Sequence, residues 1–109
     1  MIEDIDYLIS AVSYNQSDGK IKKVLTHEKK DQYGVGYPFE ETREQVLKKM
    51  EKGKSYYTLI KGQNTPFEYD VGDKIEKVEI ESEIYLRTDE RQKKKDFLGG
   101  TQSIEEFYQ

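Results

Sequence analysis

Short runs of β-branched and aromatic residues alternate with polar turns along this chain. The first run, residues 7–14, carries apolar side chains at both odd and even positions, which is typical of a strand covered on both faces. An Asp18-Gly19 pair follows in a turn cluster, and residues 21–27 return as the second strand of an antiparallel hairpin. Ile21 and Val24 break the strict alternation, which predicts a β-bulge between them.

One helix is predicted near residues 43–52. Thr42 and Gln45 have the spacing of a capping box, in which each side chain bonds the main-chain N–H of the other residue. Val46 and Met50 then lie on one face of the helix, so we expect this face to pack on a sheet.

Strands are predicted again after the helix. Residues 54–60 form an apolar and aromatic run, and a turn at Gly72-Asp73 leads into an alternating strand, residues 75–81. A tight reversal then leads to the last strand, residues 84–87.

The polar, Gly-rich stretch 28–40 is predicted to be a loop. It carries three aromatic residues, Tyr33, Tyr37 and Phe39. These side chains are either lids on the core or exposed contacts, and the sequence leaves both interpretations open.

Together these elements predict an α+β fold. We expect a single small domain over residues 1–109, with a mostly antiparallel sheet of about five strands and one main helix, in the order β-β-α-β-β-β. The ends, residues 1–6 and 101–109, are candidate frayed tails. Ser103 is placed to cap a short final turn that carries Ile104 and Phe107.

Composition limits both the core and the chemistry. Hydrophobic residues make up 34% of the chain and charged residues 37%, against roughly 45–50% and about 25% in typical domains. We therefore expect a small core in which tyrosine and phenylalanine supply much of the buried area. A net charge of −4 argues against a generic nucleic-acid binder, although a local basic patch could reverse that conclusion.

The chain lacks cysteine and has no long apolar run. The first fact excludes disulfides and thiolate metal sites, and the second predicts neither a signal peptide nor a membrane span. A cytoplasmic location is the expectation that remains by elimination.

The sequence predicts no catalytic, cofactor or metal site. His27 has no local serine and carboxylate to complete a triad, so we interpret it as a partly exposed strand residue. Glu79, Glu81 and Glu83 are better explained as a solvated outer face than as metal ligands. An anion could bind near Arg43 at the helix N-terminus, but the capping box alone explains these residues.

The last quarter of the chain combines charges with turn residues. Arg87 can form a two-pronged hydrogen bond with Asp89 or Asp96, and Gly99 allows the chain to turn back. On this interpretation these four residues form a structural latch that pins the C-terminal segment to the sheet.

The same segment also has the composition of an anion-binding site. A lysine loop, residues 93–95, follows the last strand, and exposed tyrosines of the sheet would lie beside it. Basic residues interleaved with aromatic ones are what single-stranded nucleic acid requires. We favour the latch. The candidate binding residues are Arg87, Lys93, Lys94, Lys95, Tyr56 and Tyr85.

Several fragments of the chain carry a resemblance when they are taken together: residues 9–15, 42–46, 52–54 with 56–58, the Tyr-Leu-Arg-Thr-Asp run at 85–89, and Asp-Phe-Leu-Gly at 96–99. In combination they resemble a family of short bacterial proteins that is classified as a domain of unknown function. Phe97 stands where that family usually has asparagine, and residues 100–102 replace an Asn-Leu-Pro-like ending. The resemblance implies a small bacterial domain and contributes no chemistry.

The absence of a catalytic or cofactor motif favours a non-enzymatic protein-interaction or binding module. The alternative is an accessory binder of single-stranded nucleic acid that uses the lysine loop and the sheet tyrosines. Self-association is a separate prediction: residues 7–14 are the expected dimer surface, whereas the lysines and glutamates of residues 75–81 look like edge protection.

Overall fold

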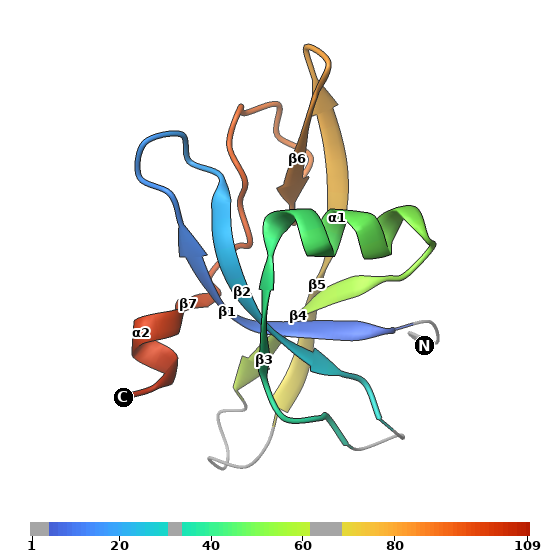
Figure 1. Ribbon diagram of the computed structural model, residues 1–109, viewed down its shortest axis with the longest axis vertical. Helices are drawn as coiled ribbons and strands as arrows, with labels where there is room; N and C mark the ends of the chain where they lie inside the picture. The colour runs from blue at the N-terminus through green and yellow to red at the C-terminus, as the bar shows by residue number, and fades with distance from the viewer. Residues whose placement is uncertain (1–4, 31–33, 62–68) are drawn as a thin grey trace.

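The computed structural model describes residues 5–30, 34–61 and 69–109. The elements in these residues are β1 (Tyr7–Tyr14), β2 (Ile21–Glu28), β3 (Phe39–Thr42), α1 (Arg43–Glu51), β4 (Tyr56–Lys61), β5 (Tyr69–Ile80), β6 (Glu83–Arg87), β7 (Gln102–Ser103) and α2 (Ile104–Phe107). The predicted class is confirmed, because the chain forms one α+β domain with a mostly antiparallel sheet and one main helix (Figure 1). Neither described helix has the length and apolar character needed to cross a bilayer.

The sheet has the strand order β3-β2-β1-β4-β5-β6, with β7 added beside β1. The antiparallel pairs are β1–β2, β2–β3, β4–β5 and β5–β6, while β4 and β7 run parallel to β1. Since β2 pairs along all of β1, β4 and β7 share its other edge. β1 is therefore a central strand, and the prediction that it forms a dimer surface is wrong.

The first hairpin follows its predicted pattern. The β1–β2 register shifts between Ser13 and Tyr14, where Lys22 is the extra residue, so the expected bulge between Ile21 and Val24 is present. A second shift makes Ser10 the extra residue on β1. This second bulge was not expected, and it decides where the Ser10 side chain points.

Two segments differ from the sequence prediction. β3 begins inside the stretch that was expected to be a loop, at Phe39, and it is held by pairing with residues 23–26 of β2. Gly72 and Asp73 do not form a turn but a bulge inside the long strand β5, opposite Thr58. A Cβ at position 72 would collide with the Thr58 hydroxyl, and that hydroxyl accepts the Asp73 N–H at 2.9 Å.

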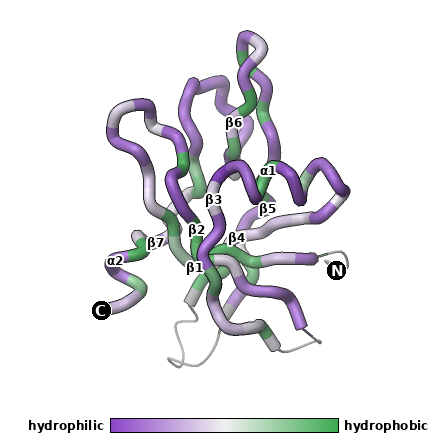
Figure 2. Tube along the Cα trace, viewed as in Figure 1, coloured by the Kyte–Doolittle hydropathy of each residue, from purple (hydrophilic) through white to green (hydrophobic). Residues whose placement is uncertain are grey.

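α1 begins at the predicted capping box, with Thr42 and Gln45 bonding each other reciprocally. α1 covers the main core and contributes Val46 to it, and the C-terminal segment contributes Leu98. Figure 2 shows the hydrophobic residues gathered where β1, β2 and β4 meet. The buried core residues are Ile9, Val12, Ile21, Val24, Val46, Tyr56, Ile75, Leu86 and Leu98.

The two ends of the chain are tied down where the structure describes them. Asp6 exchanges hydrogen bonds with Ser55, while residues 1–4 lie outside the described part. At the other end Ser103 caps α2 with its own capping box, as predicted, and α2 packs against β1. Residues 102–107 are therefore structured and not frayed.

Asp96 joins two strands that are distant in the sheet, β2 and β6. Its buried carboxylate accepts the main-chain N–H of Ile21 at 2.7 Å and that of Leu86 at 2.9 Å, which links the start of β2 to β6. Arg43, the first residue of α1, donates two further bonds to the same carboxylate, from Nε at 2.7 Å and from Nη2 at 3.2 Å. Arg43 also donates to the carbonyl of Ile84 on β6. One side chain thus connects β2, β6 and α1.

We predict that Asp96→Asn strongly destabilises the fold. The new amide group would place a donor against N–H groups and leave the Arg43 guanidinium without its carboxylate. Breaking a buried ion pair in this way typically costs about 3–5 kcal/mol. The measurement is the free energy of unfolding from urea denaturation followed by circular dichroism.

Asp73→Asn provides a matched control, because Asp73 is exposed and its carboxylate has no bond to another described residue. We expect that variant to unfold at nearly the wild-type urea concentration. Equal midpoints for the two variants would contradict the role assigned to Asp96.

Candidate binding site

The C-terminal segment contains the two-pronged bond that the sequence suggested. Arg87 donates from Nε and Nη2 to the two oxygens of Asp89, at 2.7 and 3.0 Å, and from Nη1 to the carbonyl of Lys95 at 2.8 Å. Arg87 itself is 2% exposed. The main chain of Phe97 bonds Leu86 and Thr88, the two neighbours of Arg87, and the Phe97 ring lies 5.1 Å from the guanidinium.

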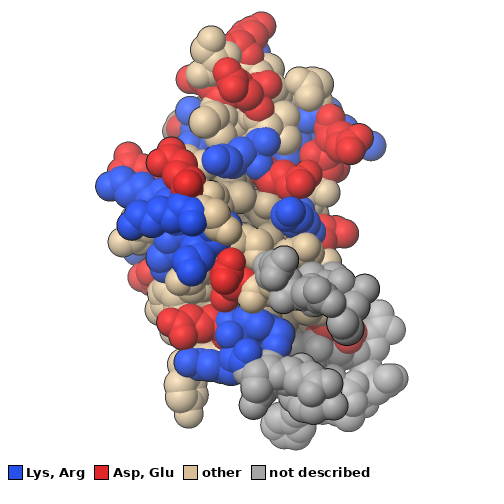
Figure 3. All heavy atoms as spheres, turned by 90° about the vertical axis from the view of Figure 1, so that its right-hand side faces the viewer, with Lys and Arg blue, Asp and Glu red and all other residues tan. Residues whose placement is uncertain are grey.

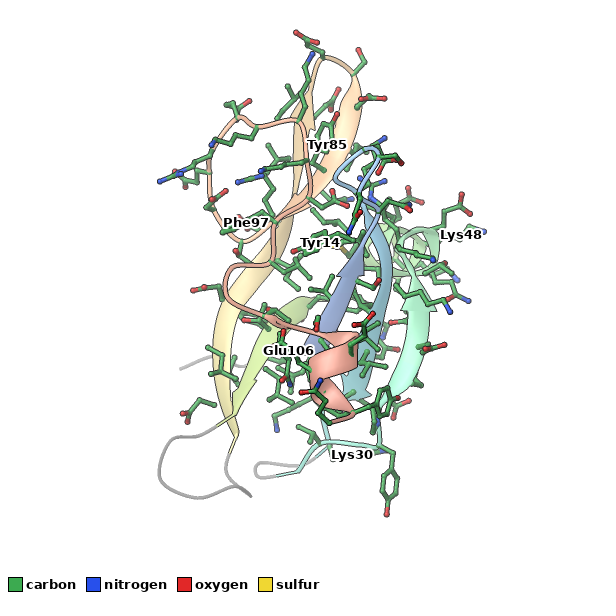
Figure 4. All side chains as sticks on the ribbon, turned by 90° about the vertical axis from the view of Figure 1, so that its left-hand side faces the viewer. Tyr14, Lys30, Lys48, Tyr85, Phe97 and Glu106 are labelled. Carbon is green, nitrogen blue, oxygen red and sulfur yellow. The ribbon has the colours of Figure 1, made fainter. Side chains whose placement is uncertain are left out.

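The other residues of the proposed latch have different partners. Asp96 binds Arg43 and not Arg87, so the alternative fork does not form. Arg43 is thereby bonded within the fold, which explains the helix N-terminus without an external anion. Gly99 has φ +62°, a left-handed conformation that suits glycine, and it follows Leu98, whose N–H binds the Tyr14 hydroxyl at 3.0 Å. Figure 4 shows this segment running from Phe97 toward α2, with Tyr14 beside it.

The lysine loop is partly engaged in contacts of its own. Lys94 forms an ion pair with Glu81 of the β5–β6 turn, and the Lys95 side chain lies against Gly19. On the face shown in Figure 3, groups of basic side chains alternate with acidic ones. Lys93 is exposed.

The structure corrects the expected exposure of the sheet tyrosines. Tyr56 is completely buried, and its hydroxyl donates to Glu41 at 2.8 Å. Burial, and then this bond, raise the pKa of Tyr56 far above its usual value. Tyr85 is 2% exposed and donates to Glu83 at 2.7 Å. Neither ring is available for stacking on a base.

His27 is also placed differently from the prediction. It is buried, and its Nδ1 lies 2.8 Å from the carbonyl of Gly36, so that Nδ1 must carry the proton and donate. Its Nε2 lies 2.7 Å from the hydroxyl of Ser10 and accepts from it when the ring is neutral. The bulge at Ser10 brings the two residues together across the β1–β2 pair.

A cavity of about 740 Å³ opens beside His27, between α2 and the chain that enters β3. Phe39 and Phe107 supply aromatic walls, and an ion pair between Glu28 and Lys30 lies at its border, with 3.1 Å between the charged atoms. We call this the aromatic cavity. Its described lining residues are His27, Glu28, Lys30, Val35, Gly36, Tyr37, Pro38, Phe39 and Phe107.

The border of the aromatic cavity carries strongly exposed aromatic residues. Of the two alternatives left by the sequence, a lid on the core or an exposed contact, Tyr37 is an exposed contact, because 95% of the residue is accessible. Phe39 is half-buried. Tyr108, 65% exposed, packs edge-on against Phe107. Tyr33 lies outside the described residues. The sequence feature that could have indicated this cavity is the group of aromatic residues in the Gly-rich stretch. That these residues lie beside α2 could not be read from the sequence, because it depends on the fold.

No cofactor site follows from these groups. Among the described residues, no cluster of three or more histidine or carboxylate side chains is placed to hold a metal ion. Two carboxylates of the C-terminal segment, Asp89 and Asp96, are bonded to arginine instead.

We predict that the pKa of Asp89 lies below the ordinary value of about 3.9, because the fork from Arg87 stabilises the charged form. The folded state therefore gains stability from this group at neutral pH, and that contribution is lost as the pH falls through the lowered pKa. Carbon-detected NMR titration of the side-chain carboxyl measures the pKa directly. In Arg87→Lys, which cannot form the fork, it should rise toward the ordinary value; an ordinary pKa in the wild type would contradict the assignment.

Comparison of the chain with family models, with curated proteins and with solved structures returned no match. The resemblance to the bacterial family of unknown function therefore remains a prediction. The case for a function rests on the geometry of the molecule.

Proposed function

We propose that this protein is a small non-enzymatic interaction module that binds a peptide segment of a partner protein at the aromatic cavity. The observation that carries the proposal is the combination of an apolar, aromatic-walled hollow with the fully projecting ring of Tyr37 at its border. Exposed tyrosine beside a concave apolar surface is typical of sites that bind proteins.

The size and chemistry of the cavity support a side-chain ligand. Its volume of about 740 Å³ is large enough for one or two apolar or aromatic side chains of a peptide. The apolar walls favour such groups, while the Glu28–Lys30 pair at the border offers polar contacts to a peptide main chain. The His27 ring is not free to serve as a polar anchor, because both of its nitrogens are bonded within the protein.

The Ser10–His27 contact gives less support to an enzyme. The third group is a main-chain carbonyl and not a carboxylate, and Ser10 is only 3% exposed. A serine nucleophile has to reach its substrate and needs oriented donors for the oxyanion. The contact is better explained as a satisfied pair of buried polar groups.

The nucleic-acid alternative also has less support. It relied on exposed rings at Tyr56 and Tyr85, and both are buried. Part of the lysine loop is bonded to an acidic neighbour, Glu81.

Peptide selection tests the proposal. A random-peptide library selected on the wild-type protein, with counter-selection on Tyr37→Ser, should yield sequences that share an aromatic or large aliphatic residue. Loss of the Tyr37 ring should weaken binding of a selected peptide by roughly tenfold or more in fluorescence anisotropy. Amide chemical shifts of Val35 and Gly36 should move on binding, because both residues line the cavity.

The control variant is Ile84→Ser, which removes an exposed apolar side chain on β6, away from the cavity. It should bind the selected peptides as the wild type does. Failure to select any peptide, or equal binding by Tyr37→Ser, would count against the proposed site.

A serine-reactive fluorophosphonate probe tests the non-enzymatic part separately. We expect no labelling of the folded protein, because the Ser10 hydroxyl is buried and donates to His27. Mass spectrometry after incubation measures it. Labelling that is abolished in Ser10→Ala would overturn this part of the proposal.

A further inference from the structure

The second half of β5 is paired on one edge only. The turn at Glu81 and Ser82 has two residues, both with positive φ (51° and 71°), which is the type that makes the flanking residues a hydrogen-bonded pair. Alternate residues of β5, at positions 76, 78 and 80, therefore bond to β6. The main-chain N–H and C=O groups of Lys77 and Glu79 point to the opposite edge.

β4 covers that opposite edge only as far as Ile75. The β4–β5 register begins with Tyr56 opposite Ile75, and before Tyr56 the chain leads back to α1. No strand of the described residues continues beside Lys77 and Glu79. The hairpin of β5 and β6 projects beyond the neighbouring strands, at the top of Figure 1.

A cavity of about 590 Å³ lies at this edge. Its lining includes the consecutive residues 74–79 of β5. Because side chains alternate between the two faces of a strand, a hollow that touches every residue of the run lies along the strand's edge and not over one face. Residues 53–55, which lead into β4, border the same hollow.

Lys77 and Glu79 are exposed, and neither forms an ion pair with another described residue. Charged residues commonly protect such an edge against pairing. Here, however, opposite charges occupy the two positions whose main chains face outward, so the edge is complementary to itself.

We propose that two copies of this protein pair through the free edges of β5, antiparallel and with the two-fold axis at Val78. In this register Lys77 of each copy lies opposite Glu79 of the other, and each of these pairs exchanges both main-chain hydrogen bonds. The two Val78 side chains meet at the axis in the close, non-hydrogen-bonded position. The sheets of the two copies thus join into one.

Charge selects this register over its neighbours. An axis at Lys77 places the two lysines directly opposite each other, and an axis at Glu79 does the same for the two glutamates; like charges in direct opposition destabilise a pair of strands. A two-fold axis between two adjacent residues, such as Lys77 and Val78, would pair them with each other. The main-chain groups of Lys77 point to the free edge, whereas those of Val78 are bonded to β6, so such a pair could not exchange hydrogen bonds. The axis at Val78 is the register that uses both free positions and pairs opposite charges.

The inference moves the expected self-association from β1 to β5. β1 has both edges occupied, whereas the segment expected to be protected supplies the open edge. The two-fold relation also makes the contact closed, so pairing stops at a dimer and does not continue into a fibre.

Charge reversal tests the dimer. Lys77→Glu would place glutamate opposite glutamate twice, and Glu79→Lys would place lysine opposite lysine twice. Each variant alone should self-associate roughly tenfold or more weakly than the wild type in sedimentation equilibrium. An equimolar mixture of the two variants should form a heterodimer, because every pair then combines opposite charges, and the double variant K77E/E79K should dimerise like the wild type.

Lys22→Glu on β2 and Glu105→Lys on α2, which change the charge of exposed residues that do not line this hollow, are the controls and should leave self-association unchanged. Circular dichroism verifies that each variant is folded. A wild type that stays monomeric at the highest soluble concentration would overturn the proposal. So would a dimer that both single reversals leave intact, or a mixture of the variants that remains monomeric.

Discussion

The carboxylate of Asp96 is the constraint on which the closure of this fold depends. β2 and β6 are not neighbours in the strand order of the sheet, so no β-ladder of the described strands joins them directly. Asp96 connects them by accepting a main-chain N–H group from each, while Arg43 neutralises the charge and reaches β6 as well. A buried carboxylate is costly to desolvate unless all its bonds are made, and here four donors surround it.

Bonded polar groups occupy much of an interior that is short of hydrophobic residues. Beside the Asp96 site, Glu41 accepts from Tyr56 and pairs with Lys49, Arg87 is buried with its bonds to Asp89 and Lys95, and the Ser10–His27 pair lies within the sheet. These networks hold residues that would otherwise be natural candidates for chemistry. Because their donors and acceptors are used internally, the two proposed binding surfaces rest on other groups, namely the aromatic side chains around the cavity and the main chain of β5.

Local chemistry explains which predictions succeed. Both capping boxes, the Asp-Gly turn, the bulge at Lys22 and the fork between Arg87 and Asp89 involve residues a few positions apart. The predictions that fail concern partners distant in sequence. The loop expected at residues 28–40 ends in the first two residues of β3 because β2 supplies their bonds, and Tyr56 is buried because Glu41 and the core surround it.

The sequence by itself determined the fold class, the main helix with its cap, the first hairpin and a fork from Arg87 to a nearby aspartate, because each follows from periodicity or from contacts between residues close in the chain. The structure decided that this aspartate is Asp89 and not Asp96. Only the tertiary structure decided that β1 is central with two parallel neighbours, that Asp96 pairs with Arg43 across 53 positions, and that Ser10 meets His27. It also decided which edge of the sheet stays open. Such contacts depend on how the strands are ordered in space, and no local pattern encodes that order.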